Sequence, residues 1–466
     1  MNLTVLLNIL VLVTCATIVT VDSWDVQLNN SIVDQLQMGE SIQVEFNSTA
    51  FQNNNSGNEF RKIELISTNL EVVSISPRFF DLPTPNNLTN TWSGTFNITG
   101  KFIGYTKVYF QMVKFKNSAI ESIVNSSENH INVVVVRKQR LIDNVFIVSV
   151  AILMSIIFIN LGCALELKQL KECIKKPIAP IITFLAQFVI LPIISYYYAK
   201  LIFPNSVTMQ LGLYFTGISP GGGAASVWAL LLGGNINLSV LLTTLGTLQS
   251  FIMIPFWAIF LGKRIFDIEE IPVPYSRIGS SVVALIIPLL IGYSIQCFMP
   301  RVCKLMIRVL KPLSSCLILF IIIFAIATNL YLFQIFSWQI ILAGAILPWT
   351  GFLIGFITAY IVGLPKADIV SMTIESGIQN TGIAIFMLKF SLGQPAADIT
   401  TVVPVAVALM TPIPLTVAFL IQKCVRKKGE VGHQDVATIS MLDEKENGIQ
   451  TEPTLLTASD NLRKQV

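Results

Sequence analysis

Two polar, glycine-bearing segments interrupt long apolar stretches of this chain. The first is Ser219-Pro220-Gly221-Gly222-Gly223-Ala224-Ala225-Ser226, and the second is Glu375-Ser376-Gly377-Ile378-Gln379-Asn380-Thr381-Gly382. In lipid, a backbone group freed from a helix must find a partner inside the protein or in a water-filled cavity. A broken helix in each half of a membrane protein indicates the binding site of a transporter. Glu375 is the only acidic residue well inside an apolar span, which also indicates a functional site.

The composition is that of a polytopic membrane protein. Hydrophobic residues make up 53% of the 466 residues and charged residues 12%, against roughly a quarter charged in soluble domains. The net charge of +4 is small and its basic residues lie mostly in loops, so no stripe for nucleic acid is expected. Nine α-helical spans, each long enough to cross about 30 Å of hydrocarbon, are expected near 145–165, 178–203, 207–232, 236–262, 277–298, 313–335, 338–362, 366–392 and 397–422.

The order of these spans predicts an inverted repeat. The broken spans are the third and the eighth, so spans one to four and six to nine form two halves of opposite topology. Lys and Arg are more frequent in the loops that are cytoplasmic if the amino terminus is outside. We therefore expect an extracellular or lumenal amino terminus and a cytoplasmic carboxyl terminus, in the plasma membrane or a membrane of the secretory pathway. The tail, residues 423–466, is expected to be disordered.

The first part of the chain has a different character. Residues 1–21 read as a secretory signal peptide, with an uncleaved anchor as the alternative. Residues 22–141 read as an extracellular or lumenal domain, because they hold six Asn-x-Ser/Thr glycosylation sites, at Asn29, Asn47, Asn54, Asn87, Asn97 and Asn125.

This extracellular domain is predicted to be rich in β-structure. Runs of β-branched and aromatic residues at 42–46, 62–66, 106–110 and 130–136 indicate a small antiparallel β-sandwich. No Cys lies between Cys15 and Cys163, so the fold must rest on its core without disulfides.

Further polar side chains within the spans indicate an oxygen-lined cation site. Gln187 lies in the second span, Ser239 and Thr243 share one face of the fourth, and Gln379 follows Glu375. Hard cations prefer carboxylate, amide, hydroxyl and carbonyl oxygens. As alternatives, the two hydroxyls bond to their own helix, and Gln187 joins helices.

Five segments carry a likeness to a known family: Phe158 to Cys163, Ala186 to Phe188, Pro220 to Gly222, Leu238 to Thr244 and Thr373 to Gly382. They resemble the bile acid:sodium symporter family, solute carrier family 10, over about residues 142–422. The most specific element is the Glu-x-Gly-x-Gln-Asn pattern that begins at Glu375. The glycosylated ectodomain is similar to that of the orphan branch of the family.

The resemblance implies two sodium sites. Ser239, Thr243 and Glu375 would form the first, and Gln187, Glu375 and Gln379 the second, with the carbonyl groups of Ser376 and Ile378. Where bile acid carriers have a Ser-Asn pair after Pro-Gly-Gly, this chain has Ala225-Ser226, so Ser226 is the one polar side chain left there for the first site. The substrate-facing residues would be Pro220, Gly221, Gly222, Asn380 and Thr381.

We therefore expect a sodium-coupled symporter of an organic anion resembling a bile acid or steroid conjugate, working by alternating access in a lipid bilayer. Na⁺ is the coupling ion, and no other cofactor is expected. The alternative is a non-transporting receptor or scaffold that keeps the transporter fold. An enzyme is not expected: Gly217-Ile218-Ser219-Pro220-Gly221 matches a hydrolase motif, but the only histidines, His130 and His433, lie outside the spans.

Overall fold

A computed structural model describes residues 24–28, 31–49, 59–83, 91–116, 119–138, 140–165, 177–267, 274–306, 308 and 337–425. Several expectations lie outside these residues: the signal peptide, the glycosylation sites Asn29, Asn54 and Asn87, the span at 313–335 and the tail after residue 425.

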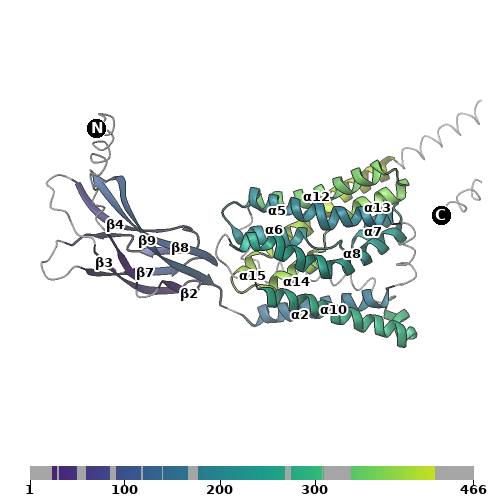
Figure 1. The fold of residues 1–466 in the computed structure, drawn as a ribbon, viewed down its shortest axis with the longest axis horizontal. Helices are drawn as coiled ribbons and strands as arrows, with labels where there is room; N and C mark the ends of the chain where they lie inside the picture. Colours follow the sequence, from purple (N-terminus) through teal and green to yellow (C-terminus); the bar gives the residue numbers. More distant parts are fainter. Residues whose placement is uncertain are drawn as a thin grey trace, which may run out of the picture.

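The amino-terminal part is a two-layered β-domain (Figure 1). Its strands are β1 Val26–Leu28, β2 Ile32–Gln37, β3 Ser41–Ser48, β4 Glu59–Ser67, β5 Val73–Ser76, β6 Phe79–Asp81, β7 Trp92–Gly100, β8 Gly104–Lys116 and β9 Ala119–Val136. One sheet has the order β1-β3-β7-β5 and the other β2-β9-β8-β4-β6. Phe46 of the first sheet lies 5.1 Å, ring centre to ring centre, from Phe110 of the second. Buried side chains from both sheets form one core, as in a sandwich.

One strand pair corrects the expected antiparallel sandwich. β2 runs parallel to β9, with Ile32 opposite Asn132 and Gln37 opposite Val136. Short turns force neighbouring strands to be antiparallel, but β2 and β9 are far apart in sequence and free of that constraint. The four expected strands correspond to β3, β4, β8 and β9, and β9 begins earlier than expected, at Ala119.

The rest of the described chain is mostly helical. The elements are α2 Leu141–Cys163, α4 Ile178–Leu185, the π-helical turn η1 Ala186–Ile190, α5 Leu191–Ile202, α6 Val207–Gly217, α7 Ala225–Leu231, α8 Ile236–Trp257, the π-helical turn η2 Ala258–Gly262, α9 Lys263–Phe266, α10 Tyr275–Phe298, α12 Trp338–Ile361, α13 Lys366–Gly377, α14 Thr381–Ser391, α15 Ala396–Ile399 and α16 Val402–Met410.

Six helices among the described residues are long and apolar enough to cross a membrane. They are Asp143–Cys163, Ile178–Ile202, Ile236–Phe266, Tyr275–Phe298, Trp338–Ile361 and Ala396–Val425. The two expected broken spans are the helix pairs α6–α7 and α13–α14. The total of nine spans and the inverted repeat stay predictions. The last helix runs to Val425, so residues 423–425 are helical and do not belong to a disordered tail.

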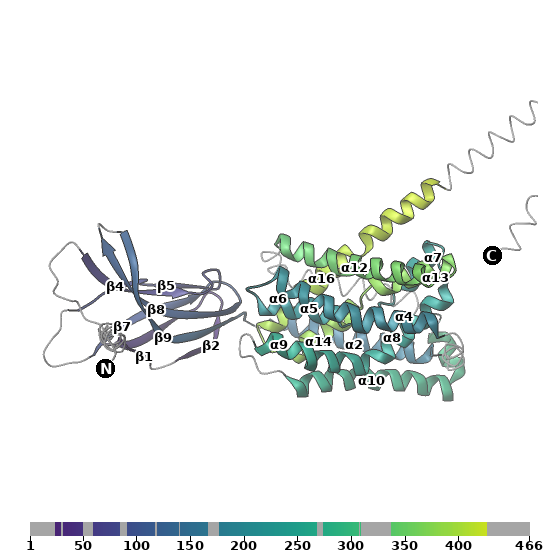
Figure 2. The ribbon, with the colours of Figure 1, turned by 45° about the horizontal axis from the view of Figure 1, so that its top comes forward.

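The helices form a bundle along the long axis of the molecule, and the β-domain stands at one end of it (Figures 1 and 2). α13 and α7 lie at the opposite end of the bundle, whereas α14 and α15 lie toward the β-domain. The strands end at Val136 and α2 begins at Leu141, so a short linker joins the two parts.

Candidate ion and substrate site

The two unwound segments cross each other inside the bundle. The amide nitrogen of Gly222 donates to the carbonyl oxygen of Ile378 at 2.8 Å, and that of Asn380 donates to the carbonyl oxygen of Pro220 at 2.8 Å. Each break therefore satisfies backbone groups that the other break has freed from a helix. This meets the requirement that lipid imposes on a spanning chain.

Gly221 lies at the centre of the crossing, where it forms an antiparallel bridge with Gln379. A β-carbon at Gly221 would collide with Oε1 of Glu375 and would lie 3.2 Å from Nε2 of Gln187. Only glycine lets the backbone approach these side chains so closely.

The carboxylate of Glu375 is buried and only partly satisfied. Its exposed fraction is 0%. Oε2 accepts hydrogen bonds from Oγ1 of Thr243 at 2.9 Å and from Oγ of Ser239 at 3.3 Å, both on α8. Oε1 has no hydrogen-bond partner among the described residues. A buried charge in this position is costly unless a cation or further donors meet it.

Two glutamines add unpaired oxygens to the same cluster. Gln187 is fully buried in η1, and neither atom of its amide has a hydrogen-bond partner in the described part of the chain. Its Oε1 lies 3.3 Å from where a β-carbon of Gly246 would be, so this amide fills the space between α8 and the crossing. Nε2 of Gln379 donates to the carbonyl of Ser376 at 3.3 Å, and its Oε1 has no partner among the described residues.

This set of groups fits a hard monovalent cation. Three buried oxygens, one of them anionic, lack donors in the described part of the chain, and oxygens of this kind are the ligands that such ions prefer. π-Helical turns such as η1 occur frequently at functional sites, because the extra residue redirects a side chain.

The structure places the three other expected ligands as follows. Ser226 is in the first turn of α7, and no hydrogen bond is described between it and Glu375, Ser239 or Thr243. The carbonyl of Ser376, the expected ligand group of that residue, accepts from Nε2 of Gln379 and faces Gly351 of α12. The carbonyl of Ile378 already accepts from Gly222, which leaves it one lone pair for a cation.

Of the five expected substrate residues, Asn380 and Thr381 stand at the start of α14, and Pro220, Gly221 and Gly222 lie in the first break. Asn380 caps α14, because its Oδ1 accepts from the amide of Ile383 at 3.1 Å. Asn380 and Thr381 are half-buried. Sδ of Met154 on α2 lies 3.3 Å from where a β-carbon of Gly382 would be, so α2 faces this end of the crossing.

One group of residues near the site was not anticipated. Nδ2 of Asn235 donates to Oδ1 of Asp368 at 2.8 Å, and Oγ of Ser371 donates to the carbonyl of Asn235 at 2.8 Å. These bonds join the start of α8 to the start of α13, the two helices that carry Ser239 and Glu375. An Asn before an apolar helix is a readable capping signal, but its pairing with α13 depends on the folded structure.

Comparisons with known proteins bear on this site. The sequence model of the sodium bile acid symporter family matches residues 151–336. The rabbit (Oryctolagus cuniculus) ileal sodium/bile acid cotransporter is 31% identical over 246 residues, which cover 52% of this chain and 69% of that protein. This chain belongs to the sodium bile acid symporter family.

Other relatives of the family are similar at comparable levels. The human P3 protein is 31% identical over 261 residues, 55% of this chain and 54% of its own length. Sodium/bile acid cotransporter 5 of Mus musculus is 26% identical over 280 residues, 59% of this chain and 64% of its own length. The chain thus covers about half the length of the P3 protein. The family resemblance read from the motifs is confirmed, and the chain is a multi-pass membrane protein of a transporter family.

Proposed function

We propose that this chain is a sodium-coupled symporter of an organic anion, resembling a bile acid or a steroid conjugate. The observation that carries the proposal is the crossing of two unwound helices beside a buried, half-satisfied carboxylate, Glu375. Sodium is the coupling ion, carried across the membrane together with the substrate.

The buried polar residues would hold sodium at two positions. Ser239 and Thr243 already hold one oxygen of Glu375, so a sodium ion on that side would bind the oxygens of these three groups. A second ion would lie between Oε1 of Glu375 and the amides of Gln187 and Gln379. Binding neutralises the carboxylate and joins α8 to α13 across the break.

The substrate is assigned to the α14 side of the crossing. The amide groups of the first turn of α14 carry a partial positive charge that favours an anion. The first break contributes less than its sequence suggests, because α7 begins at Ala225 and not near Gly221. Asn380 and Thr381 are the polar side chains available to the substrate there.

Transport follows by alternating access, in which one group of helices rocks against the other around this site. With the β-domain outside the membrane, inward movement of sodium is favoured by about 2.3 kcal/mol per charge for each 100 mV of potential. This orientation, a plasma or secretory-pathway membrane, and glycosylation of the β-domain are parts of the same proposal.

Two measurements test the function. The purified protein should show a higher midpoint of thermal unfolding in sodium chloride than in choline chloride at equal ionic strength. Cells that express it should take up at least one member of a panel of bile acids and steroid sulfates only when sodium is present. If a folded, surface-exposed protein shows neither effect, the symporter is contradicted and the receptor or scaffold is favoured.

A further inference from the structure

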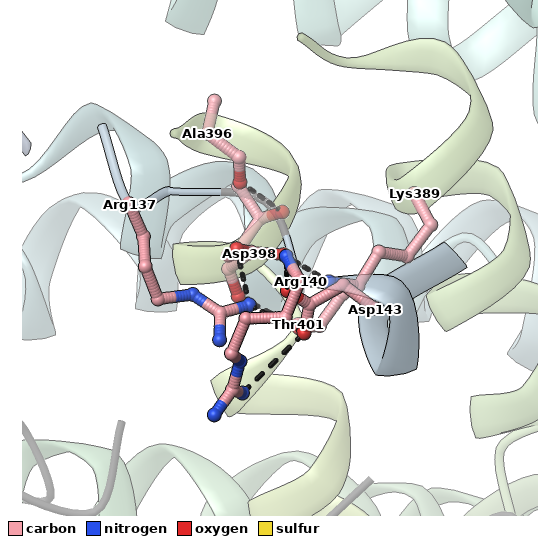
Figure 3. Close-up of polar contacts among 8 residues, drawn as sticks. Arg137, Arg140, Asp143, Lys389, Ala396, Asp398 and Thr401 are labelled. Carbon is pink, nitrogen blue, oxygen red and sulfur yellow. Dashed lines mark hydrogen bonds and ion pairs between the residues drawn. The ribbon is translucent and has the colours of Figure 1, made fainter. Parts of the chain in front are cut away.

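The linker between the β-domain and α2 enters a network of buried charges. Nη2 of Arg137 lies 2.7 Å from Oδ1 of Asp143 in the first turn of α2 and 3.9 Å from Oδ2 of Asp398 on α15. Asp398 also pairs with Lys389 of α14. Figure 3 shows these side chains gathered around Asp398.

Burial makes this network different from a surface ion pair. The side chains of Lys389 and Asp398 are 5% exposed, and those of Arg137 and Asp143 are 14% and 15% exposed. Exposed pairs contribute little to stability, whereas breaking a buried pair is costly. Arg137 thus links α2 to α15 at the end of the bundle that carries the β-domain.

The β-domain contacts the bundle at a second place. Ile103, in the turn between β7 and β8, is 3% exposed. It shares an apolar cluster with Ile202 and Phe203 at the end of α5 and with Met209 of α6. The domain therefore rests on α5 and α6 through Ile103, while its linker runs into α2.

The helices that the β-domain and its linker contact belong to two differently packed groups. α2 and α10 form a tight pair, because a β-carbon at Gly162 would collide with the backbone of Leu289 and one at Gly292 with that of Ile159. Such close contacts let two helix backbones pack as a unit.

The second group contains the crossing. A β-carbon at Gly212 of α6 would collide with the carbonyl of Thr400, and α12 packs equally closely on α13. Where α2 meets α14, the contact is made instead by side chains: the flexible Met154 lies on Gly382, and α2 and α14 share an apolar cluster that includes Leu153 and Phe386. A boundary made by side chains can separate more easily than one made by interlocked backbones.

We propose that the β-domain is an outer clamp, which holds the α2–α10 pair against the crossing group through Arg137–Asp398 and through the seat of Ile103 on α5 and α6. Opening the bundle toward the β-domain requires α2 to leave α15, which breaks the Arg137–Asp398 contact. The clamp therefore favours the state closed on that side. This inference rests on the proposed alternating access, but its test does not use sodium or a substrate.

The test measures how often the bundle opens on the side of the β-domain. Met154→Cys places a thiol at the boundary, about 16 Å along α2 from Asp143 at 1.5 Å per residue. The measured quantity is the rate at which this thiol reacts with a membrane-impermeant maleimide applied from outside to intact cells. The labelling rate of the parent chain, which keeps Met154, is subtracted as background. Labelling is divided by the amount of protein at the surface.

Arg137→Gln should raise the labelling rate at least about tenfold, equivalent to about 1.4 kcal/mol in the opening equilibrium. The variant leaves each acid a basic partner, since Asp143 keeps Arg140 and Asp398 keeps Lys389. Arg140→Gln is the matched control: Arg140 has an ion pair with Asp143 but is 53% exposed, and its loss should leave labelling at the parent rate.

Ile103→Ala tests the second contact and stays informative if Arg137→Gln does not fold. It should also raise labelling, whereas Leu70→Ala, at a side chain of the β-domain that is 62% exposed, should not. If Arg137→Gln is labelled at the same rate as Arg140→Gln, the Arg137–Asp398 contact has no part in the clamp. If Ile103→Ala is labelled at the same rate as Leu70→Ala, the contact of Ile103 with α5 and α6 has no part in the clamp.

The clamp and the symporter can fail separately. Faster labelling without any sodium effect on stability supports the clamp and contradicts the symporter. Stabilisation by sodium, with labelling unchanged in Arg137→Gln and Ile103→Ala, supports the symporter and contradicts the clamp.

Discussion

Glu375 is the residue on which the proposed ion site depends. It lies in the last turn of α13, with α8 hydroxyls on one oxygen and, among the described residues, no donor on the other. A carboxylate held in this way in the interior stores an unfavourable desolvation energy. In the proposed function, sodium binding would relieve it, so occupancy of the site and stability of the fold would be linked.

Glu375→Gln should therefore remove most of the stabilisation by sodium. The substitution keeps the size of the side chain and removes its charge. The parent protein should gain about 2.7 kcal/mol at a hundredfold excess of sodium over the dissociation constant, measured as a shift in thermal unfolding. Ser239→Ala, which removes one neutral ligand, should reduce the shift less. A Glu375→Gln protein that folds and responds to sodium like the parent would leave Glu375 with a structural role only.

Gly221→Ala should disturb the same site through its backbone. The new methyl group would meet Oε1 of Glu375 and Nε2 of Gln187, so the crossing must widen. Such overpacking costs about 1–3 kcal/mol, and both thermal stability and the sodium shift should fall. Gly223→Ala is the control, because its β-carbon would meet no atom within 4 Å. Equal behaviour of the two variants would show that the close approach at Gly221 has no role.

At the scale of elements, a polar seam between α8 and α13 sets the geometry of the site. Asn235 and Asp368 join the helix starts, and farther along Thr243 reaches Glu375. Oδ1 of Asn235 also accepts from the amide of Leu238 and so caps α8. The capping residue thus fixes both where α8 begins and how it faces α13.

Asn235→Ala should lose the cap, worth about 1 kcal/mol, and should also weaken the response to sodium, because Ser239 and Thr243 are no longer held against Glu375. The measurement is thermal unfolding over a series of sodium concentrations. Asn237→Ala, at an exposed position two residues later, should change neither quantity. Lower stability with an unchanged sodium dependence would limit Asn235 to the role of a helix cap.

At the scale of the whole molecule, a β-sandwich and a membrane bundle share one chain, and Ile103 and Arg137 are two of the places where they meet. Among the described glycosylation sites, Asn97 is exposed on β7, whereas Asn47 and Asn125 are half-buried. Asn97 is thus the described site most open to a glycan. A glycan there would also confirm on which side of the membrane the β-domain lies.

Removal of N-glycans should shift the protein strongly downward on a denaturing gel, and Asn97→Gln alone should remove one step of that shift. Asn237→Gln is the control, because Asn237 also heads a glycosylation motif but lies on the predicted cytoplasmic side. An unshifted band from a native-like host would contradict the orientation. Loss of a step in Asn237→Gln would contradict it as well.

The sequence alone determined the class of the protein, the positions of the two breaks and the family. These features are local: long apolar runs, glycine and proline within them, and a Glu-x-Gly-x-Gln-Asn pattern can be read without knowing which segments touch. It also indicated Gln187, Ser239, Thr243, Glu375 and Gln379, which the structure brings into one cluster, although their role as sodium ligands stays a prediction.

Only the tertiary structure decided which residues meet. It paired the two breaks by backbone hydrogen bonds, ran β2 parallel to β9, and left Ser226 without a described hydrogen bond to the cluster. It also joined Asn235 to Asp368 across 133 residues. Periodicity and capping signals act over a few residues of chain, whereas such contacts form because distant segments satisfy one another's polar groups and fill one another's space.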